Sequence, residues 1–236
     1  MNHSLSFERP LVTVDLTIFS VIEGALRVLL VRRPFGQSEP FPGMWALPGG
    51  FLDVKLDPDL EACALRKLEE KTGISAPYLE QVGSWGSAKR DPRGWSATHV
   101  YFALLPLDDL DVGPGANSVD VQWAPIEGSR VKEKLAFDHS EILKAAITRL
   151  RNKVEYTSLP AFLLKSEFTL TELQRVYEVV LARPLEKKAF RTRMLSVDFL
   201  EPASKYKEGA NRPAQLFRLR NKRRLVYFSR PFSPRD

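Results

Sequence analysis

Charged residues are distributed unevenly along this chain, and this asymmetry is the feature that most constrains its architecture. Residues 1–150 hold 16 basic and 20 acidic residues, a net charge of −4, whereas residues 151–236 hold 19 and 9, a net charge of +10. Twelve of the 13 glycines and all four tryptophans also lie before residue 129. Because 236 residues are enough for two separate cores, we expect two domains, residues 1–155 and 156–236, with the boundary near Tyr156 to Pro160.

The composition excludes several classes of protein. Hydrophobic residues make up 44% and charged residues 27%, which is the balance of a folded globular chain. The single cysteine, Cys63, excludes an internal disulfide framework and a multi-cysteine metal site. The longest apolar run, Leu16 to Ile22, is too short to span a bilayer, and the first residues lack a basic-then-apolar signal pattern. We therefore expect a cytoplasmic protein without a membrane partner.

The first part of the chain has the pattern of an α/β domain. Residues that favour β-structure predict strands at 11–19, 26–31, 79–85, 98–105 and 119–124. Glu23-Gly24 separates the first two as a hairpin break. Proline and glycine dominate from Pro34 to Gly50, which predicts a long, shaped loop.

Two helices are expected in the same part. One runs from Pro58 to Lys71, with Asp57 as its cap and Gly73 at its end. The other runs from His139 to Leu150, with apolar residues repeating every four positions. His139 itself is expected to be a cap-region residue rather than a ligand-binding group.

The most specific pattern lies at the end of the loop and in the first helix. Leu47-Pro48-Gly49-Gly50-Phe51 is followed by Arg66-Lys67-Leu68-Glu69-Glu70-Lys71-Thr72-Gly73-Ile74. Together these segments resemble the Nudix box, in which a glycine, five residues, a glutamate and seven residues precede Arg-Glu-U-x-Glu-Glu-x-Gly-U, with U a bulky aliphatic residue. The resemblance covers about the first 150 residues. It implies an α/β/α sandwich that holds a nucleoside diphosphate derivative and binds divalent metal through glutamates for pyrophosphate hydrolysis.

The chain departs from this pattern at the metal ligands. When the box is aligned on Arg66 and Gly73, Lys67 takes the place of the first metal-binding glutamate. Glu70 takes the place of the second, and Lys71 that of the third. The pattern therefore retains one of the three glutamates.

Neighbouring acids do not restore the site. A helix turns about 100° per residue, so Glu69 points about 160° away from Lys67. The upstream glutamate of the box falls on Pro58. The face formed by Lys67, Glu70 and Lys71 has a net charge of +1 where the family has −3, and a hard divalent cation needs several oxygen ligands. We expect weak or no metal-dependent hydrolysis, no catalytic residues, no metal site and no required cofactor, magnesium included.

Two interpretations of the lysines remain open. Lys67 and Lys71 can pair directly with a pyrophosphate, in place of the metal. Alternatively, they are ordinary solvated lysines on a helix surface.

A second segment bears on the ligand. Lys89-Arg90-Asp91-Pro92-Arg93-Gly94-Trp95 resembles the Arg-Asp-Pro-Arg-Gly stretch of Nudix proteins related to ADP-ribose pyrophosphatases. Arginine forks suit phosphate; the alternative is a charged hairpin tip with solvated arginines. Arg32 and Arg33 are further phosphate candidates, and Phe41, Trp45 and Phe51 are candidates for base stacking, although aromatic residues there are more often core. The predicted ligand-binding residues are Arg33, Gly49, Gly50, Lys67, Glu70, Lys71, Arg90 and Arg93.

The basic second part has the pattern of a DNA-binding module. Thr169-Leu170-Thr171-Glu172 is a capping box and predicts a helix start. Arg183-Pro184 breaks the chain before a second amphipathic helix, about Leu185 to Val197. A strand-like segment, 215–219, follows a polar, basic tip at 205–213.

This order of elements resembles a winged helix-turn-helix domain. The predicted DNA-binding residues are Lys187, Lys188, Arg191 and Thr192 on the second helix and Lys205, Lys207 and Arg212 in the wing. We expect the helix to enter the major groove and the wing to contact the backbone. The alternative is a small basic helical domain with a solvated face, but clustered positive charge favours phosphate neutralisation.

The two parts together resemble the Nudix-related transcriptional regulators of NAD metabolism, over nearly the whole chain. The resemblance implies a bacterial repressor that senses ADP-ribose or a related NAD derivative. It also implies a homodimer that binds a palindromic operator in double-stranded DNA and releases it when the effector binds.

Two other hypotheses stay open. One is an active Nudix hydrolase of ADP-ribose or another nucleoside diphosphate derivative, whose basic tail binds RNA or mediates dimerisation. The other is a bifunctional enzyme and regulator in which Glu70 works with Asp57 or Asp53.

Overall fold

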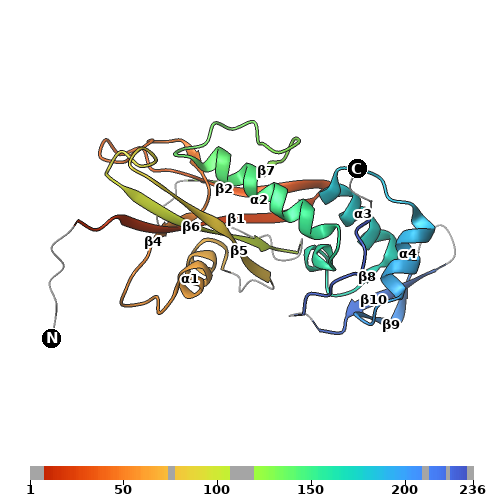
Figure 1. Cartoon of the computed structure of the whole chain (residues 1–236). Coiled ribbons are helices and arrows are strands. Elements are labelled where there is room, and N and C mark those ends of the chain that lie inside the picture. Colours follow the sequence, from red (N-terminus) through yellow and green to blue (C-terminus); the bar gives the residue numbers. More distant parts are fainter. Residues whose placement is uncertain (1–7, 74–77, 107–119, 209–212, 222–223, 233–236) are drawn as a thin grey trace.

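The computed structural model describes residues 8–73, 78–106, 120–208, 213–221 and 224–232. The elements form two lobes along one long axis (Figure 1). A mixed sheet with helices α1 and α2 occupies one end, and α3, α4 and a small sheet occupy the other. No helix among the described residues is both long enough and apolar enough to cross a bilayer.

The first lobe is built on a seven-stranded sheet. Its strands are β1 (Leu11–Ile22), β2 (Ala25–Arg32), β3 (Trp45–Ala46), β4 (Gly49–Phe51), β5 (Tyr78–Ser87), β6 (Ser96–Leu104) and β7 (Asp120–Pro125). The strand order is β3-β2-β1-β6-β5, with β4 paired to β1 and β7 to β2. β1 and β6 are parallel and the other pairs are antiparallel. The predicted hairpin break is confirmed: Glu23 and Gly24 have positive φ angles of 52° and 74°, as a type I′ turn requires.

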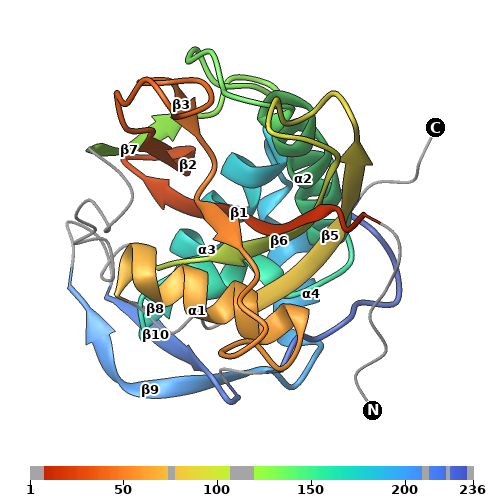
Figure 2. The ribbon, with the colours of Figure 1, turned by 90° about the vertical axis from the view of Figure 1, so that its left-hand side faces the viewer.

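Helices α1 (Leu60–Thr72) and α2 (His139–Val154) cover opposite faces of this sheet, which makes the three-layered α/β/α arrangement (Figure 2). The alternation of side chains along β6 explains this. Tyr101 and Ala103 join the core under α1, whereas Phe102 and Leu104 join the core under α2. Each helix therefore buries its apolar stripe against one face of the strands.

The start of α1 differs from the prediction. The helix begins at Leu60, and its cap is Asp59, whose carboxylate accepts a hydrogen bond from the Ala62 amide at 2.8 Å. Asp57, predicted as the cap, binds Arg66 instead. The predicted end is confirmed, because Gly73 adopts the left-handed conformation with φ 68°.

The second lobe contains the elements of a winged helix. They are β8 (Phe168–Thr169), α3 (Leu170–Leu181), α4 (Lys187–Leu195), β9 (Leu200–Lys207) and β10 (Ala214–Leu219), and the strand order is β8-β10-β9. The predicted capping box is present: Thr169 Oγ1 accepts from the Glu172 amide, and the Glu172 carboxylate accepts from the Thr169 amide. α4 is shorter than predicted because Glu186 caps it and Ser196 ends it.

The wing also differs in detail from the prediction. Lys205 and Lys207 lie within strand β9 rather than at the tip of the hairpin. Arg212 lies outside the described residues.

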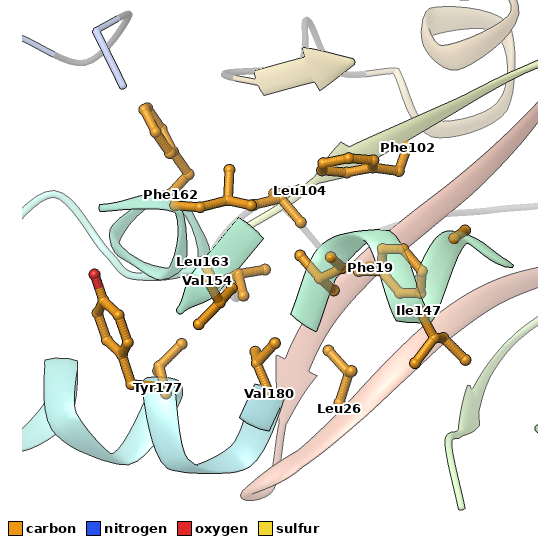
Figure 3. Close-up of a cluster of buried hydrophobic side chains, with 14 of the residues drawn as sticks. Phe19, Leu26, Phe102, Leu104, Ile147, Val154, Phe162, Leu163, Tyr177 and Val180 are labelled. Atoms are coloured by element: carbon orange, nitrogen blue, oxygen red, sulfur yellow. The ribbon is translucent and has the colours of Figure 1, made fainter. Parts of the chain in front are cut away.

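The two lobes share one apolar core. Figure 3 shows Phe19, Leu104 and Val154 of the first lobe beside side chains of the second lobe, among them Phe162 and Tyr177. The short 3-10 helix η2 (Leu159–Leu163), at the expected boundary, is fully buried. A domain division at residues 155 and 156 stays a prediction, and the segment that joins the two parts is a packed element rather than an exposed linker.

Candidate functional site

A cavity of about 380 Å³ lies between β1, β4, α1, the loop before β3, the loop before β6 and the start of α2. The structure brings all eight predicted ligand-binding residues to its wall: Arg33, Gly49, Gly50, Lys67, Glu70, Lys71, Arg90 and Arg93. These residues come from separate stretches of the sequence. Their role in binding a ligand stays a prediction, but their convergence on one cavity supports it.

The two glycines let strand β4 approach its neighbours closely. A Cβ atom on Gly49 would overlap Asp15 Oδ1 and the carbonyl of Val14. A Cβ atom on Gly50 would lie 3.1 Å from Lys67 Cε, a tight contact with a flexible side chain. Gly49 is therefore required by rigid surroundings, and Gly50 leaves room for the lysine.

The face of α1 that lines the cavity has the charges predicted from the sequence. Glu70 lies between Lys67 and Lys71, and its carboxylate accepts from Arg66 at 2.7 Å and from Lys67 Nζ at 3.0 Å. Burial raises the pKa of Glu70, but hydrogen bonds from Lys67 and Arg66 outweigh it and lower the pKa overall. Glu70 is thus an ionised carboxylate that is already engaged by two cations.

Lys71 is the exception among these cations. Its side chain lines the cavity and the residue is 7% exposed. Within the part of the chain that the structure describes, its amine makes neither an ion pair nor a hydrogen bond, and burial lowers its pKa. A buried ammonium group without a partner lowers the stability of the folded protein unless an anion binds to it.

The three arginines of the cavity wall are fixed by protein partners. Arg90 is buried and donates two hydrogen bonds of 2.9 Å to the Asp138 carboxylate. Arg93 is held in the same forked manner by Asp91, at 3.0 and 2.8 Å. Arg90 is buried and is therefore not a freely solvated hairpin arginine. The side chain of Arg93 is 39% exposed, so for Arg93 the alternative of a solvated hairpin arginine stays open.

Arg33 is also restrained. Its guanidinium donates to Glu39 at 2.8 Å and to the carbonyl of Pro40 at 2.7 Å. Burial lowers its pKa. Arg32 donates to the carbonyl of Gly43, and it is not among the described residues that line the cavity.

Asp15 and His139 are two of the cavity residues that the sequence analysis did not predict, and Thr13 and Glu39 are others. His139 is 3% exposed, and its Nδ1 accepts from the Leu47 amide at 2.9 Å, which places the ring proton on Nε2. Nε2 lies 3.6 Å from Asp15 Oδ2. The predicted cap-region position of His139 is confirmed, because it is the first residue of α2, directly after the cap position Asp138. Its ring also lies in the cavity wall.

Asp15 is held ionised by its neighbours. Burial raises its pKa, but His139, Thr98 and Arg90 together outweigh this effect and lower it. Asp15 therefore contributes a fixed negative charge beneath Gly49.

Only one of the three aromatic stacking candidates lines the cavity. Phe51 is 44% exposed there, and the guanidinium of Arg93 lies 5.0 Å from its ring centroid. Phe41 packs edge-on against Phe137 at 4.7 Å. Trp45 packs against the main core.

The donor set of the cavity does not fit a divalent metal. Its four carboxylates, which belong to Asp15, Glu39, Glu70 and Asp91, each face at least one cationic side chain. Across the described ranges, no group of three or more histidine, cysteine or acidic residues is arranged to hold a metal ion. The acids of the bifunctional hypothesis do not add ligands: neither Asp53 nor Asp57 is among the described residues of the wall.

The second lobe presents a separate cationic surface. Phe190 and Met194 bury one side of α4, and the predicted DNA-binding residues Lys187, Lys188, Arg191 and Thr192 are exposed on the other. Lys205 is exposed on β9, whereas Lys207 forms an ion pair of 2.6 Å with Glu172 at the start of α3. The contact of these residues with DNA stays a prediction.

Comparisons with known proteins agree with both lobes. Residues 13–146 match the family model of the NUDIX domain, and residues 160–219 match that of the NrtR DNA-binding winged helix domain. An ADPR responsive transcriptional repressor NtrR of Acinetobacter baylyi is 50% identical over 212 residues, which cover 90% of this chain and 83% of that protein.

Two solved structures extend the comparison. NrtR of Shewanella oneidensis complexed with a 27mer DNA is 38% identical, with a TM-score of 0.83, and the match covers 93% of this chain and 98% of that one. The NUDIX domain of the same NrtR complexed with ADP ribose is 41% identical, with a TM-score of 0.55, covering 61% of this chain and 91% of that one. These matches confirm the predicted pairing of a Nudix domain with a winged helix, and the chain belongs to the NrtR family.

Proposed function

We propose that the chain is a transcriptional repressor that binds duplex DNA through its winged helix and responds to ADP-ribose bound in the Nudix cavity. The observation that carries this proposal is the replacement of the metal-binding face by Lys67 and Lys71 in a chain whose second lobe exposes a basic helix. The relative from Acinetobacter baylyi, named as an ADPR responsive repressor, supports the same reading.

The cavity supplies positive charge for a diphosphate without a metal. Among the described residues, Lys71 has no ion-pair partner. Lys67 is paired with Glu70 and Arg93 with Asp91, and each of these two cations can also bind an added anion. An ammonium group balances phosphate charge, but it does not turn a bound water into a hydroxide nucleophile as a metal does. We therefore infer binding of ADP-ribose with no metal, no other required cofactor and no hydrolysis. The solved Nudix domain of Shewanella oneidensis NrtR, complexed with ADP ribose, supports the choice of ligand.

The winged helix supplies the DNA contacts. Lys187, Lys188, Arg191 and Thr192 form one exposed face, and a helix of this kind fits the major groove. Lys205, Lys207 and Arg212 contact the phosphate backbone. The chain acts as a homodimer on a palindromic operator and represses genes of NAD metabolism in the bacterial cytoplasm, as the family resemblance implies.

Helix α2 connects the two sites. It begins at Asp138 and His139 beside the cavity, and its last turns contact the second lobe: Arg151 donates to the Val180 carbonyl at 2.9 Å. Just beyond the helix, Glu155 accepts from Arg183 at 2.8 Å. An effector changes DNA affinity only if it binds two arrangements of the protein differently. Because α2 contacts both the cavity and the second lobe, ADP-ribose binding can change how the two lobes are arranged. We expect this change to lower the affinity for DNA.

The test is a titration of the protein into labelled duplex DNA from the region upstream of its own gene, with and without ADP-ribose. The proposal requires tight, salt-dependent binding that ADP-ribose weakens. Equal affinity for this duplex and for unrelated DNA, with no response to ADP-ribose, contradicts it.

The rival function, an active Nudix hydrolase, has its own test. Incubation with ADP-ribose and magnesium should leave the nucleotide intact. Rapid turnover to AMP would show that Glu70 supports metal chemistry despite its contacts with Arg66 and Lys67.

A further inference from the structure

Residues 224–232, which we call the C-terminal strap, pack beside α4. The amide of Phe228 donates to the carbonyl of Tyr156 at 2.8 Å, and the Phe228 side chain is buried. The guanidinium of Arg193, on α4, lies 4.0 Å from the ring centroid of Phe232. The strap begins after residue 219, where the match to the winged helix family ends. The strap is therefore held in place by its contacts with Tyr156, just after α2, and with Arg193 on α4.

A groove of about 880 Å³ separates the strap from α4. Lys188 and Thr192 line one side, and these two residues also belong to the exposed face that we assign to DNA. Ser229 and Arg230 line the strap side, and both are exposed. Arg230 makes no ion pair or hydrogen bond with any residue that the structure describes.

The acidic residue of this groove does not neutralise it. Glu186 is the single acidic residue among the described residues that line the groove. Its carboxylate accepts from the backbone amides of Lys188 and Ala189, at 2.8 and 2.6 Å, and so caps α4. The amides at the start of α4 are consequently occupied, and the side chains of Lys188 and Arg230 remain available to an anion.

We propose that the C-terminal strap is a second DNA-contacting element, in which Arg230 binds a backbone phosphate next to the major groove that receives α4. This inference rests on the proposed function. A helix in the major groove has a phosphate backbone on each side. Lys188 and Thr192 line the groove, and at about 100° per residue Lys187 and Arg191 lie about 100° further around α4, at the edge of the exposed face away from the strap. Arg230 therefore meets the backbone on the side nearest Lys188.

The experiment compares Arg230→Ala, Arg230→Glu and Arg230→Lys in the full chain, with labelled duplex from the upstream region over a series of salt concentrations. Arg230→Ala should raise Kd several-fold and reduce the slope of log affinity against log salt by about 1.8, which is about 0.9 for each of the two phosphate contacts that the homodimer loses. Arg230→Glu should raise Kd further, and Arg230→Lys should restore most of the affinity. Lys55→Ala is the matched control: Lys55 is an exposed cation in the loop before α1, in the other lobe, so Kd and slope should not change.

The outcomes separate this inference from the proposed function. If the unsubstituted protein binds the duplex and all three Arg230 variants match its Kd and slope, the strap makes no contact and the inference is wrong. If the unsubstituted protein does not bind the duplex, the proposed function itself fails. If Arg230→Glu changes the mass of the free protein in solution and leaves the salt slope unchanged, the groove faces a second copy of the chain, which also overturns the inference.

Discussion

The cavity of the first lobe and the exposed face of α4 are both cationic, but their charges are arranged in opposite ways. In the cavity, Arg90 and Arg93 are each oriented by a carboxylate. On α4, Lys187, Lys188 and Arg191 are exposed and make no ion pair with any described residue. This difference suits the proposed roles, because fixed geometry favours a compact anion in the cavity and exposed charge favours an extended polyanion along α4. The two sites should therefore respond differently to salt, substitution and pH.

Salt should separate the two sites most strongly. If the wings of a homodimer engage about six phosphates, DNA affinity should fall roughly a thousandfold between 50 and 200 mM salt. ADP-ribose affinity should fall by less than about fivefold, because buried pairs are screened less than exposed ones. Fluorescence anisotropy and isothermal titration calorimetry on one preparation measure both. Equal salt slopes would remove the contrast between a fixed cavity and a free surface.

The glycines test the fixed geometry of the cavity. Gly49→Ala should lower the free energy of unfolding by about 3 kcal/mol, because the new Cβ overlaps Asp15 Oδ1 and the backbone of Val14. Gly50→Ala is the matched control, and its cost should be about 1 kcal/mol or less, since the flexible Lys67 side chain can move aside. Urea unfolding measures both. Similar costs for the two variants would show that the strands adapt and that the cavity is not rigid.

Lys71 tests whether the cavity binds an anion through an unpaired amine. Lys71→Met should raise the Kd for ADP-ribose about tenfold, the loss of roughly one charge-assisted contact. It should also raise the free energy of unfolding, because it removes a buried amine without a partner among the described residues. Lys144→Met, at an exposed position of α2, should change neither quantity. Weaker binding together with lower stability would mean that Lys71 has a structural role only.

The same amine gives ADP-ribose binding a pH dependence. Burial lowers the pKa of Lys71 below its ordinary value of 10.5, so the free protein loses this proton at lower pH than an exposed lysine would. A bound diphosphate favours the ammonium form, and binding then takes up a proton. ADP-ribose affinity should therefore fall as the pH rises through the lowered pKa, and Lys71→Met should show no such fall.

The smallest expected effect is on the coupling between the two sites. Arg183→Ala removes the ion pair with Glu155 at the end of α2, and it should reduce the effect of ADP-ribose on DNA affinity about threefold. Each affinity measured alone should stay the same. Lys132→Ala breaks a pair with Glu127 on the first lobe and should leave the coupling intact. A full response in the Arg183 variant would place the coupling elsewhere.

Sequence patterns predicted the features that depend on neighbouring residues. The capping box of Thr169 and Glu172, the hairpin turn at Glu23 and the helix end at Gly73 are each set within a few positions of the chain. The cationic face of α1 could be predicted for the same reason, since helix periodicity alone places Lys67 beside Lys71.

Features that depend on distant residues could not be predicted in this way. His139 enters the cavity wall because it accepts a hydrogen bond from Leu47, 92 residues earlier. Lys207 is paired to Glu172 across 35 residues, and nothing within the wing signals this contact. Asp57 fits the sequence pattern of a helix cap, but its carboxylate accepts a hydrogen bond from Arg66, nine residues later. Asp59 caps α1 instead. Tertiary contacts decided each of these cases.

In the proposed mechanism, ADP-ribose in the Nudix cavity weakens DNA binding by the winged helix, and the nucleotide is not cleaved. The most direct measurement follows labelled upstream duplex by anisotropy and AMP by chromatography in the same sample, with magnesium and again with a chelator. We expect ADP-ribose to raise the Kd for DNA at least about fivefold, equally with magnesium and with the chelator, while no AMP forms. Rapid formation of AMP with magnesium, together with a DNA affinity that ADP-ribose does not change, would contradict it.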